Sequence, residues 1–176
     1  MPLRTPKICS MIVIVAGPSG SGKTTVGAML AGRLHWPFAD ADEFHPAANI
    51  AKMSAGIPLA DEDRWPWLRA IVAWMDEREA TGQDAIVTCS ALKQSYRDVL
   101  MDGRPWTRLV YLSVDADQLA KRLASRQGHF FSGKLLASQL AAIEPPEPDE
   151  HTLVLDERDG PEETVDQIVS WLAEAR

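Results

Sequence analysis

Residues 17–24 of this 176-residue chain are Gly17-Pro18-Ser19-Gly20-Ser21-Gly22-Lys23-Thr24. They match the pattern G-x-x-x-x-G-K-[ST] in full, which is typical of a loop whose backbone N–H groups surround phosphate oxygens. Glycines let the backbone approach the phosphates closely, and the helix that follows adds the positive end of its dipole. Lys23 is then expected to reach the β- and γ-phosphates of a nucleoside triphosphate, and the Thr24 hydroxyl to bind Mg²⁺. The residues predicted to bind the nucleotide here are Gly17, Ser19, Gly20, Ser21, Gly22, Lys23, Thr24 and Thr25.

The segments on both sides of the loop support this interpretation. Met11–Ala16 is a short apolar run typical of a strand buried on both faces, and Gly22–Leu34 carries apolar residues at helical spacing. Further strands are predicted at Trp36–Ala39, Ala85–Cys89, Arg108–Ser113 and Thr152–Leu155. Further helices are predicted at Ala48–Ala55, Asp61–Ala80, Leu92–Met101, Asp115–Leu123, Gly133–Ile143 and Pro161–Leu172. This alternation predicts an α/β fold, a parallel sheet with helices on both faces.

Composition narrows the class of partner. The chain has 25 acidic against 18 basic residues and a net charge of −7, which disfavours nucleic acid and anionic membranes. Cys9 and Cys89 are too few for a disulfide framework or a zinc site. The apolar run after Arg4 and Lys7 is too short for a signal peptide, so a cytoplasmic protein is expected. Residues 1–10 are predicted to be a flexible tail before a single domain at 11–176, and either Met1 or Met11 is the true start.

Two aspartates, Asp40 and Asp42, follow the second predicted strand. Alternation along a strand puts both side chains on one face, and parallel sheets bind ligands at the carboxyl ends of their strands. One carboxylate can hold Mg²⁺ while the other accepts a hydroxyl proton. The third predicted strand ends without an acid, so we assign Asp40, with Thr24, to the metal and Asp42 to the substrate hydroxyl, the reverse assignment being open. His45 follows at once and is assigned to the same pocket.

The chain contains no Asn-Lys-x-Asp sequence, which a GTPase would need to recognise guanine. What remains is a small kinase that passes the γ-phosphoryl group to a bound small molecule. Its cations would neutralise phosphate charge, because phosphoryl transfer depends mainly on positioning and electrostatics.

Beyond the loop, a series of blocks between about residues 12 and 150 resembles the small gluconate kinases of the P-loop superfamily. The blocks are Asp40-Ala41-Asp42, His45-Pro46, Asn49-Ile50, Lys52-Met53, Gly56–Leu59, Asp61–Arg64, Pro66–Leu68, Cys89–Lys93, Tyr96–Asp98, Gly128–Phe131, Glu144 and Pro148–Glu150. The chain departs from the family's common residues at Pro18, Thr24, Ala41 and Gln127, and no departure removes a group that the reaction needs.

This resemblance implies that the chain uses ATP and Mg²⁺ to phosphorylate D-gluconate at the C6 hydroxyl, giving 6-phospho-D-gluconate and ADP. It implies a fold similar to that of shikimate kinase, with five parallel strands in the order 2-3-1-4-5 and a mobile lid at about residues 126–134. Members of the family are commonly dimers, so the resemblance also raises the expectation of a homodimer.

The resemblance extends to individual side chains. Arg64 is similar to an arginine that holds the substrate carboxylate in shikimate kinase, a task for which a guanidinium is suited. Lys93 and Arg97, four residues apart, are expected on one helical face beside it. Arg122 and Arg126 are expected on the ATP phosphates when the lid closes, and adenine near Asp156–Gly160. The predicted catalytic residues are Lys23, Asp42 and Arg126, and the predicted substrate-binding residues are Asp42, His45, Arg64, Lys93, Arg97 and His129.

Two other readings of the same residues stay open. One is a sister kinase that acts on shikimate or another sugar acid. The other is a nucleotide-binding regulator without catalysis, which is disfavoured by the retention of Lys23, Thr24, Asp40, Asp42, Arg122 and Arg126. Trp65, Trp67 and Trp74 are expected to serve packing or a dimer surface, since an open-chain acid offers no ring face for stacking.

Overall fold

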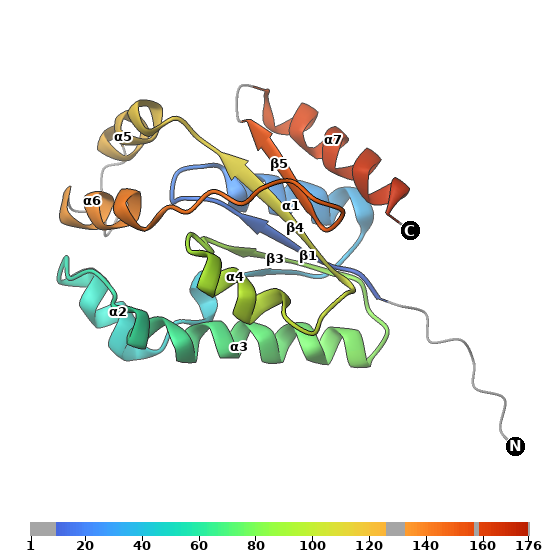
Figure 1. The fold of residues 1–176 in the computed structure, drawn as a ribbon, viewed down its shortest axis with the longest axis horizontal. Helices are drawn as coiled ribbons and strands as arrows, with labels where there is room; N and C mark the ends of the chain where they lie inside the picture. Colours follow the sequence, from blue (N-terminus) through green and yellow to red (C-terminus); the bar gives the residue numbers. More distant parts are fainter. Residues whose placement is uncertain (1–9, 126–132, 157–158, 176) are drawn as a thin grey trace, which may run out of the picture.

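The computed structural model describes residues 10–125, 133–156 and 159–175. Its five strands form one parallel sheet in the order β2-β3-β1-β4-β5 (Figure 1). The strands are β1 (Ile12–Ala16), β2 (Phe38–Asp40), β3 (Ala85–Cys89), β4 (Thr107–Ser113) and β5 (Thr152–Asp156). The fold class and the strand order predicted from the sequence are therefore confirmed. The predicted tail (except Ser10) and most of the predicted lid, at 126–132, lie outside the described residues.

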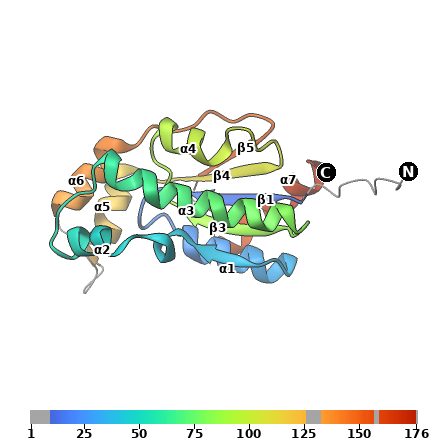
Figure 2. The same cartoon turned by 90° about the horizontal axis from the view of Figure 1, so that it is seen from below.

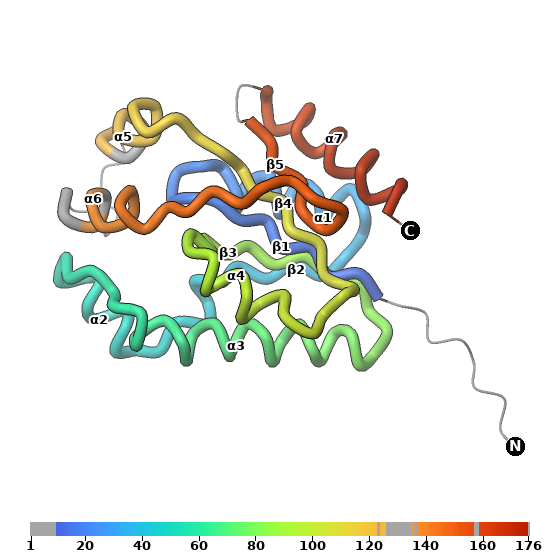
Figure 3. The backbone as a smooth tube through the Cα atoms, viewed as in Figure 1, coloured from blue at the N-terminus to red at the C-terminus, as the bar shows by residue number. Residues whose placement is uncertain are grey.

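Helices cover both faces of this sheet. They are α1 (Lys23–Leu34), the 3₁₀ helix η1 (Ala41–Phe44), α2 (Ala47–Ser54), α3 (Asp61–Ala80), α4 (Gln94–Met101), α5 (Ala116–Ser125), α6 (Gly133–Ala142) and α7 (Pro161–Glu174). Helices α1 and α7 pack on one face, and α3 and α4 on the other (Figure 2). Helices α2, α5 and α6 lie beyond the carboxyl ends of the strands (Figure 3). No helix in the described part of the chain is long and apolar enough to span a membrane.

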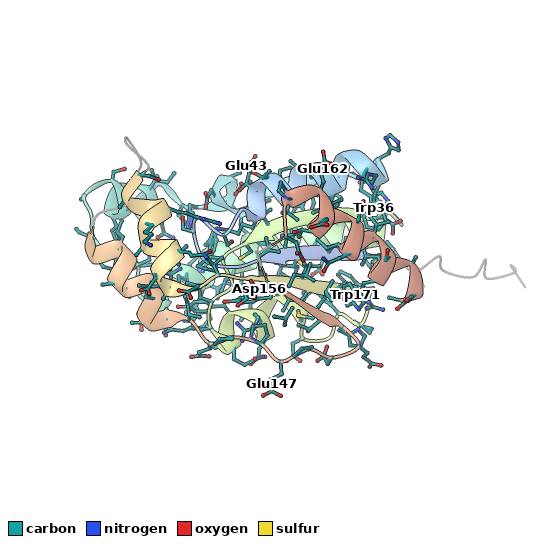
Figure 4. All side chains as sticks on the ribbon, turned by 90° about the horizontal axis from the view of Figure 1, so that it is seen from above. Trp36, Glu43, Glu147, Asp156, Glu162 and Trp171 are labelled. Atoms are coloured by element: carbon teal, nitrogen blue, oxygen red, sulfur yellow. The ribbon has the colours of Figure 1, made fainter. Side chains whose placement is uncertain are left out.

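Alternation along the central strands divides the core into two layers. Ile12 and Ile14 of β1 face the layer that contains Trp67 and Ile71 of α3, whereas Val13 and Val15 face the layer of α1 and α7. All of β1 is fully buried, as its unbroken apolar sequence predicted. Trp36 and Trp171 pack against the second layer, at the end away from α5 and α6 (Figure 4).

Strand β2 begins two residues later than predicted. His35 ends α1 with a left-handed φ of 56°, and the Trp36 N–H donates to the Ala31 carbonyl. Trp36 therefore belongs to the end of the helix and not to the strand. Pairing with β3 starts at Phe38 and stops at Asp40, which lies opposite Thr88. Asp40 is thus the last residue of this strand, and its carboxylate lies at the carboxyl end of the sheet.

Helix α1 packs very closely on the sheet at Gly27. A Cβ atom at this position would lie 2.7 Å from Thr88 Cγ2 and 2.8 Å from Phe38 Cε2. A Cβ atom at Gly32, on the same helix, would meet nothing within 4 Å. The short distance at Gly27 brings the start of α1 near the ends of β2 and β3.

Gly27→Ala should lower the free energy of unfolding by about 1–3 kcal/mol, because the added methyl overpacks the contact between α1 and the sheet. Gly32→Ala is the matched control and should raise stability by up to about 1 kcal/mol, since alanine is the better helix former. Urea unfolding of the two variants measures both values. Equal effects would contradict the close-packing argument.

Candidate active site

The phosphate-binding loop connects β1 to α1 at the carboxyl edge of the sheet. Gly17, Gly20 and Gly22 have φ angles of 148°, 84° and 85°, a region that favours glycine. A Cβ atom at Gly17 would also lie 2.7 Å from Ser21 Oγ and 2.8 Å from the Leu112 carbonyl oxygen. The loop thus has the backbone shape that its glycines predicted, and α1 begins at Lys23 with its N-terminus toward the loop.

Thr24 and Asp40 meet at the base of this loop. The Thr24 hydroxyl donates to Asp40 Oδ2 at 3.1 Å, which joins the first turn of α1 to the end of β2. Both groups are hard oxygen donors, and Mg²⁺ is commonly held by one or two carboxylates together with phosphate oxygens and water. The pair therefore fits a magnesium ion. Phosphate oxygens of the nucleotide and water would supply the other ligands of such an ion. Among the described residues there is no cluster of three or more histidine, cysteine, aspartate or glutamate side chains suited to a metal.

Asp42 is not on the strand, contrary to the prediction from alternation. Strand β2 ends at Asp40, and η1 begins at once because the Asp42 N–H donates to Asp40 Oδ1 at 3.0 Å. Desolvation by the surrounding protein raises the pKa of the Asp42 carboxyl, the negative charge of Asp40 adds to this rise, and Lys23 opposes it. The Asp42 side chain is 88% exposed and lies close enough to Lys23 to be influenced by its positive charge.

His45 is packed and oriented by residues that the sequence argument did not assign. Its ring stacks on Trp67, with centroids 4.4 Å apart and an interplanar angle of 7°. Trp67 is itself buried and donates from Nε1 to the Ala41 carbonyl at 2.7 Å, so it serves packing, as expected. Its indole thereby fixes the plane of the imidazole beside η1.

Asn49 determines which nitrogen of His45 carries the proton. Asn49 is buried, and its Nδ2 lies 2.9 Å from the Asp63 carbonyl and 3.3 Å from His45 Nδ1. A carbonyl can only accept, so the amide NH₂ must face Asp63, and its second hydrogen points at His45 Nδ1. Nδ1 is therefore the acceptor and Nε2 carries the hydrogen. Nε2 faces Asp42 Oδ1 at 4.0 Å, too far for a direct hydrogen bond.

Burial lowers the pKa of His45 from 6.5 to about 4, and the nearby positive charge of Arg64 contributes to the shift. Between these values the unfolded chain binds a proton that the folded chain excludes, so stability must fall as the pH is lowered from 6.5 toward 4. Urea unfolding at pH 7 and pH 5 should show this loss in the wild type and a smaller one in His45→Gln. Identical pH dependence in both proteins would count against a neutral His45.

Arg64 lies in the first turns of α3, beside a set of polar groups that satisfy one another. Asp61 accepts from Tyr96 Oη at 2.5 Å and from Lys93 Nζ at 3.0 Å, and the Tyr96 hydrogen bond is the main cause of its lowered pKa. Arg64 stacks over the Tyr96 ring at 5.5 Å, and its positive charge lies near Asp61 and Asp63, but it makes no hydrogen bond or ion pair with any residue that the structure describes. Its guanidinium therefore remains available to an anion, whereas Lys93 is already paired with Asp61.

The structure does not support the prediction that Arg97 binds substrate. Arg97 is 3% exposed, and its guanidinium donates to the carbonyls of Ala91, Leu92 and Glu144. The positive φ of Ala91 and the start of α4 at Gln94 turn this side chain inward, so Lys93 and Arg97 do not share an exposed helical face. Glu144 Oε2 in turn accepts from the Gln94 N–H at 2.7 Å. Arg97 thus fastens the segment after α6 to the loop after β3.

Helices α5 and α6 each contact the phosphate-binding loop. Arg122 Nη1 of α5 donates to the Gly20 carbonyl at 3.3 Å, which places this predicted ATP-binding arginine at the loop. Gln139 Oε1 of α6 accepts from the Ser19 N–H at 2.9 Å. Arg126 and His129 lie outside the described residues. Nothing in the sequence distinguished Gln139, whereas the four-residue spacing of His45 and Asn49 was a usable signal for that pair.

A cavity of about 190 Å³ opens beside the loop, toward the start of α7. It is lined by Ser21, Gly22, Thr25, Val26, Leu112, Asp159, Pro161 and Thr164. Asp156, at the end of β5, and Glu162, in the first turn of α7, mark this region in Figure 4. A larger hollow of about 280 Å³ lies at the amino ends of β4 and β5, far from the loop, and is lined by Arg108, His151 and Trp171 among others.

Comparisons with known proteins bear on this site. A family model described as shikimate kinase matches residues 19–173. The gluconokinase of Gluconobacter oxydans (strain 621H) is 42% identical over 157 residues, which cover 89% of this chain and 88% of that protein. The thermoresistant gluconokinase of Escherichia coli (strain K12) is 40% identical over 154 residues, 88% of each. The chain belongs to the gluconokinase family of P-loop kinases.

Solved structures agree with the gluconokinase family. A gluconokinase from Sinorhizobium meliloti 1021 superposes with a TM-score of 0.80 at 42% identity, covering 96% of this chain and 94% of that one. An unliganded sugar kinase from Janibacter sp. HTCC2649 gives 0.85 at 48% identity, covering 93% and 95%. Shikimate kinase from Aquifex aeolicus, at 19% identity and a TM-score of 0.56, shares the fold. The predicted family is confirmed.

Proposed function

We propose that this protein is a gluconokinase, which transfers the terminal phosphoryl group of ATP to the C6 hydroxyl of D-gluconate. The observation that carries the proposal is the juxtaposition, in a chain 40–43% identical to named gluconokinases, of a complete phosphate-binding loop with Asp40 and Asp42 at the adjoining strand end. A cytoplasmic location and a homodimer remain expectations.

The triphosphate is assigned to the loop, with Lys23 and Arg122 against its phosphates. The cavity between the loop and the start of α7 is assigned to the nucleoside, in support of which it borders both Thr25 and Asp159. Thr24 and Asp40 are assigned to Mg²⁺, which would offset the negative charge of the phosphates when bound. Arg126 and His129 keep the roles that the resemblance implies.

The acceptor is assigned to the space between η1, α3 and α4. Arg64 is proposed to bind the carboxylate of the acid, because no hydrogen bond or ion pair with a described residue occupies its guanidinium. His45, kept neutral by burial and with its Nδ1 facing Asn49, is proposed to donate from Nε2–H to a substrate hydroxyl. Asp42 is proposed to accept the proton of the C6 hydroxyl, leaving that oxygen free to attack the terminal phosphorus.

A coupled assay of ADP release tests the function directly, with Mg-ATP and a panel of D-gluconate, other aldonates, shikimate, glucose and glycerate. Selective turnover of D-gluconate is expected. Turnover of shikimate alone would favour a sister kinase, and binding of ATP without turnover of any acid would favour a regulator.

Asp42→Asn should reduce kcat by about 10²–10⁴-fold, the usual contribution of a general base. The control is Glu43→Gln, an equal loss of charge at the next residue, where the side chain lies on the outside of η1 (Figure 4). Steady-state kinetics at saturating ATP separate the two variants. A wild-type rate for Asp42→Asn would remove the base from this position.

Arg64→Ala should raise KM for D-gluconate at least about tenfold while KM for ATP changes little, because a charge-assisted contact to the acid is lost. Arg69→Ala removes the same charge from an exposed position of α3 and should leave both constants near wild type. Equal increases in the two KM values would contradict the assignment of Arg64 to the substrate carboxylate.

A further inference from the structure

Gln139 is an amide-bearing side chain of α6 that reaches the phosphate-binding loop. It contacts Ser19, 120 residues earlier in the chain, through a 2.9 Å hydrogen bond from the Ser19 N–H to Gln139 Oε1. Helix α6 otherwise packs mainly against α5. This bond is therefore a specific link between the loop and a helix that comes more than 100 residues after it.

The Ser19 N–H belongs to the same peptide unit as the Pro18 carbonyl, and that carbonyl accepts from Lys23 Nζ at 3.5 Å. A trans peptide is planar, and its N–H and C=O point in opposite directions. Whatever holds the N–H therefore sets the direction of the carbonyl. Gln139 and Lys23 thus bind opposite ends of one planar peptide group, Gln139 at its N–H and Lys23 at its carbonyl.

We propose that Gln139 is a positioning residue for Lys23. By accepting from the Ser19 N–H, Gln139 keeps the Pro18 carbonyl turned toward the ammonium group of Lys23. The carbonyl then holds this ammonium group beside the loop, where the β- and γ-phosphates would bind. Without Gln139, the Ser19 N–H would lose its partner, and the Ser21 N–H would remain as the backbone donor that holds the Pro18–Ser19 peptide. The proposal rests on the proposed use of ATP.

The neighbouring hydrogen bonds support a role for this one peptide. The Ser21 N–H donates to the Pro18 carbonyl at 3.0 Å, and the Gly17 N–H donates to Ser90 at 3.3 Å. The Pro18 carbonyl therefore accepts from both the Ser21 N–H and Lys23 Nζ, and the Ser19 N–H of the same peptide donates to Gln139. A side chain of equal length without an oxygen would leave that donor unmatched.

A double-mutant cycle tests the proposal by nucleotide binding, not by turnover. The full-length proteins are wild type, Gln139→Met, Lys23→Met and the double variant, and the probe is a non-hydrolysable ATP analogue with Mg²⁺, titrated by calorimetry. Gln139→Met should weaken binding about two- to tenfold in the wild-type background, the scale of one hydrogen bond, and have no effect in the Lys23→Met background. Additive losses would overturn the proposal, because Gln139 would then act on the nucleotide independently of Lys23.

Two further measurements exclude a merely structural effect. Gln118→Met, the same substitution at an exposed position of α5, should leave analogue affinity unchanged. Exchange of the Ser19 amide hydrogen should accelerate in Gln139→Met and not in Gln118→Met, and unchanged exchange would contradict the contact itself. If the wild type binds no ATP analogue, the proposed function fails; if it binds and Gln139→Met binds equally well, only the positioning role fails.

Discussion

The backbone at Gly17 is the constraint on which the rest of the site depends. The chain leaves β1 there with a φ of 148°, and the space a Cβ atom would need is already taken by Ser21 Oγ and the Leu112 carbonyl. Only a residue without a side chain lets the loop turn so tightly against β4. Because β1 is the middle strand of the sheet, this turn starts α1 at the carboxyl ends of the strands, and α1 then reaches past β3 to β2, where the Thr24 hydroxyl donates to Asp40.

Local patterns in the sequence predicted the sheet and the loop but not the contacts between segments. The glycine-rich motif and the buried β-branched runs act over a few residues, so the loop and the parallel sheet followed from them, whereas the strand order followed from the resemblance. The bonds of Asn49 to Asp63 and of Gln139 to Ser19 join residues 14 and 120 positions apart, and no local pattern reveals them. Asp42 was correctly predicted to lie at the carboxyl ends of the strands, but it is not on the strand itself. The hydrogen bond from the Asp42 N–H to Asp40 ends β2 at Asp40.

Arg97 shows why charge alone is an unsafe guide to a binding role. In the sequence it stands beside a lysine at helical spacing, the pattern of a cationic surface. In the fold it is buried, and backbone carbonyls and the Gln94 side chain take up its N–H groups. Arg64, which has no such partners, is the cation left for an anionic ligand. Burial and competition between partners separate the two arginines, and both depend on tertiary structure.

The Arg97 guanidinium joins the turn after β3 and the adjoining start of α4 to the segment after α6, where Glu144 lies 47 residues later in the chain. Glu144 makes two more hydrogen bonds between the same segments: its side chain accepts from the Gln94 N–H, and its own N–H donates to the Leu92 carbonyl at 2.8 Å. Moving the segment after α6 away from the turn after β3 would break all of these bonds at once and would remove one acceptor from the buried Arg97 guanidinium. We therefore expect the Gln94 and Glu144 amides to become exposed to solvent in the same local opening.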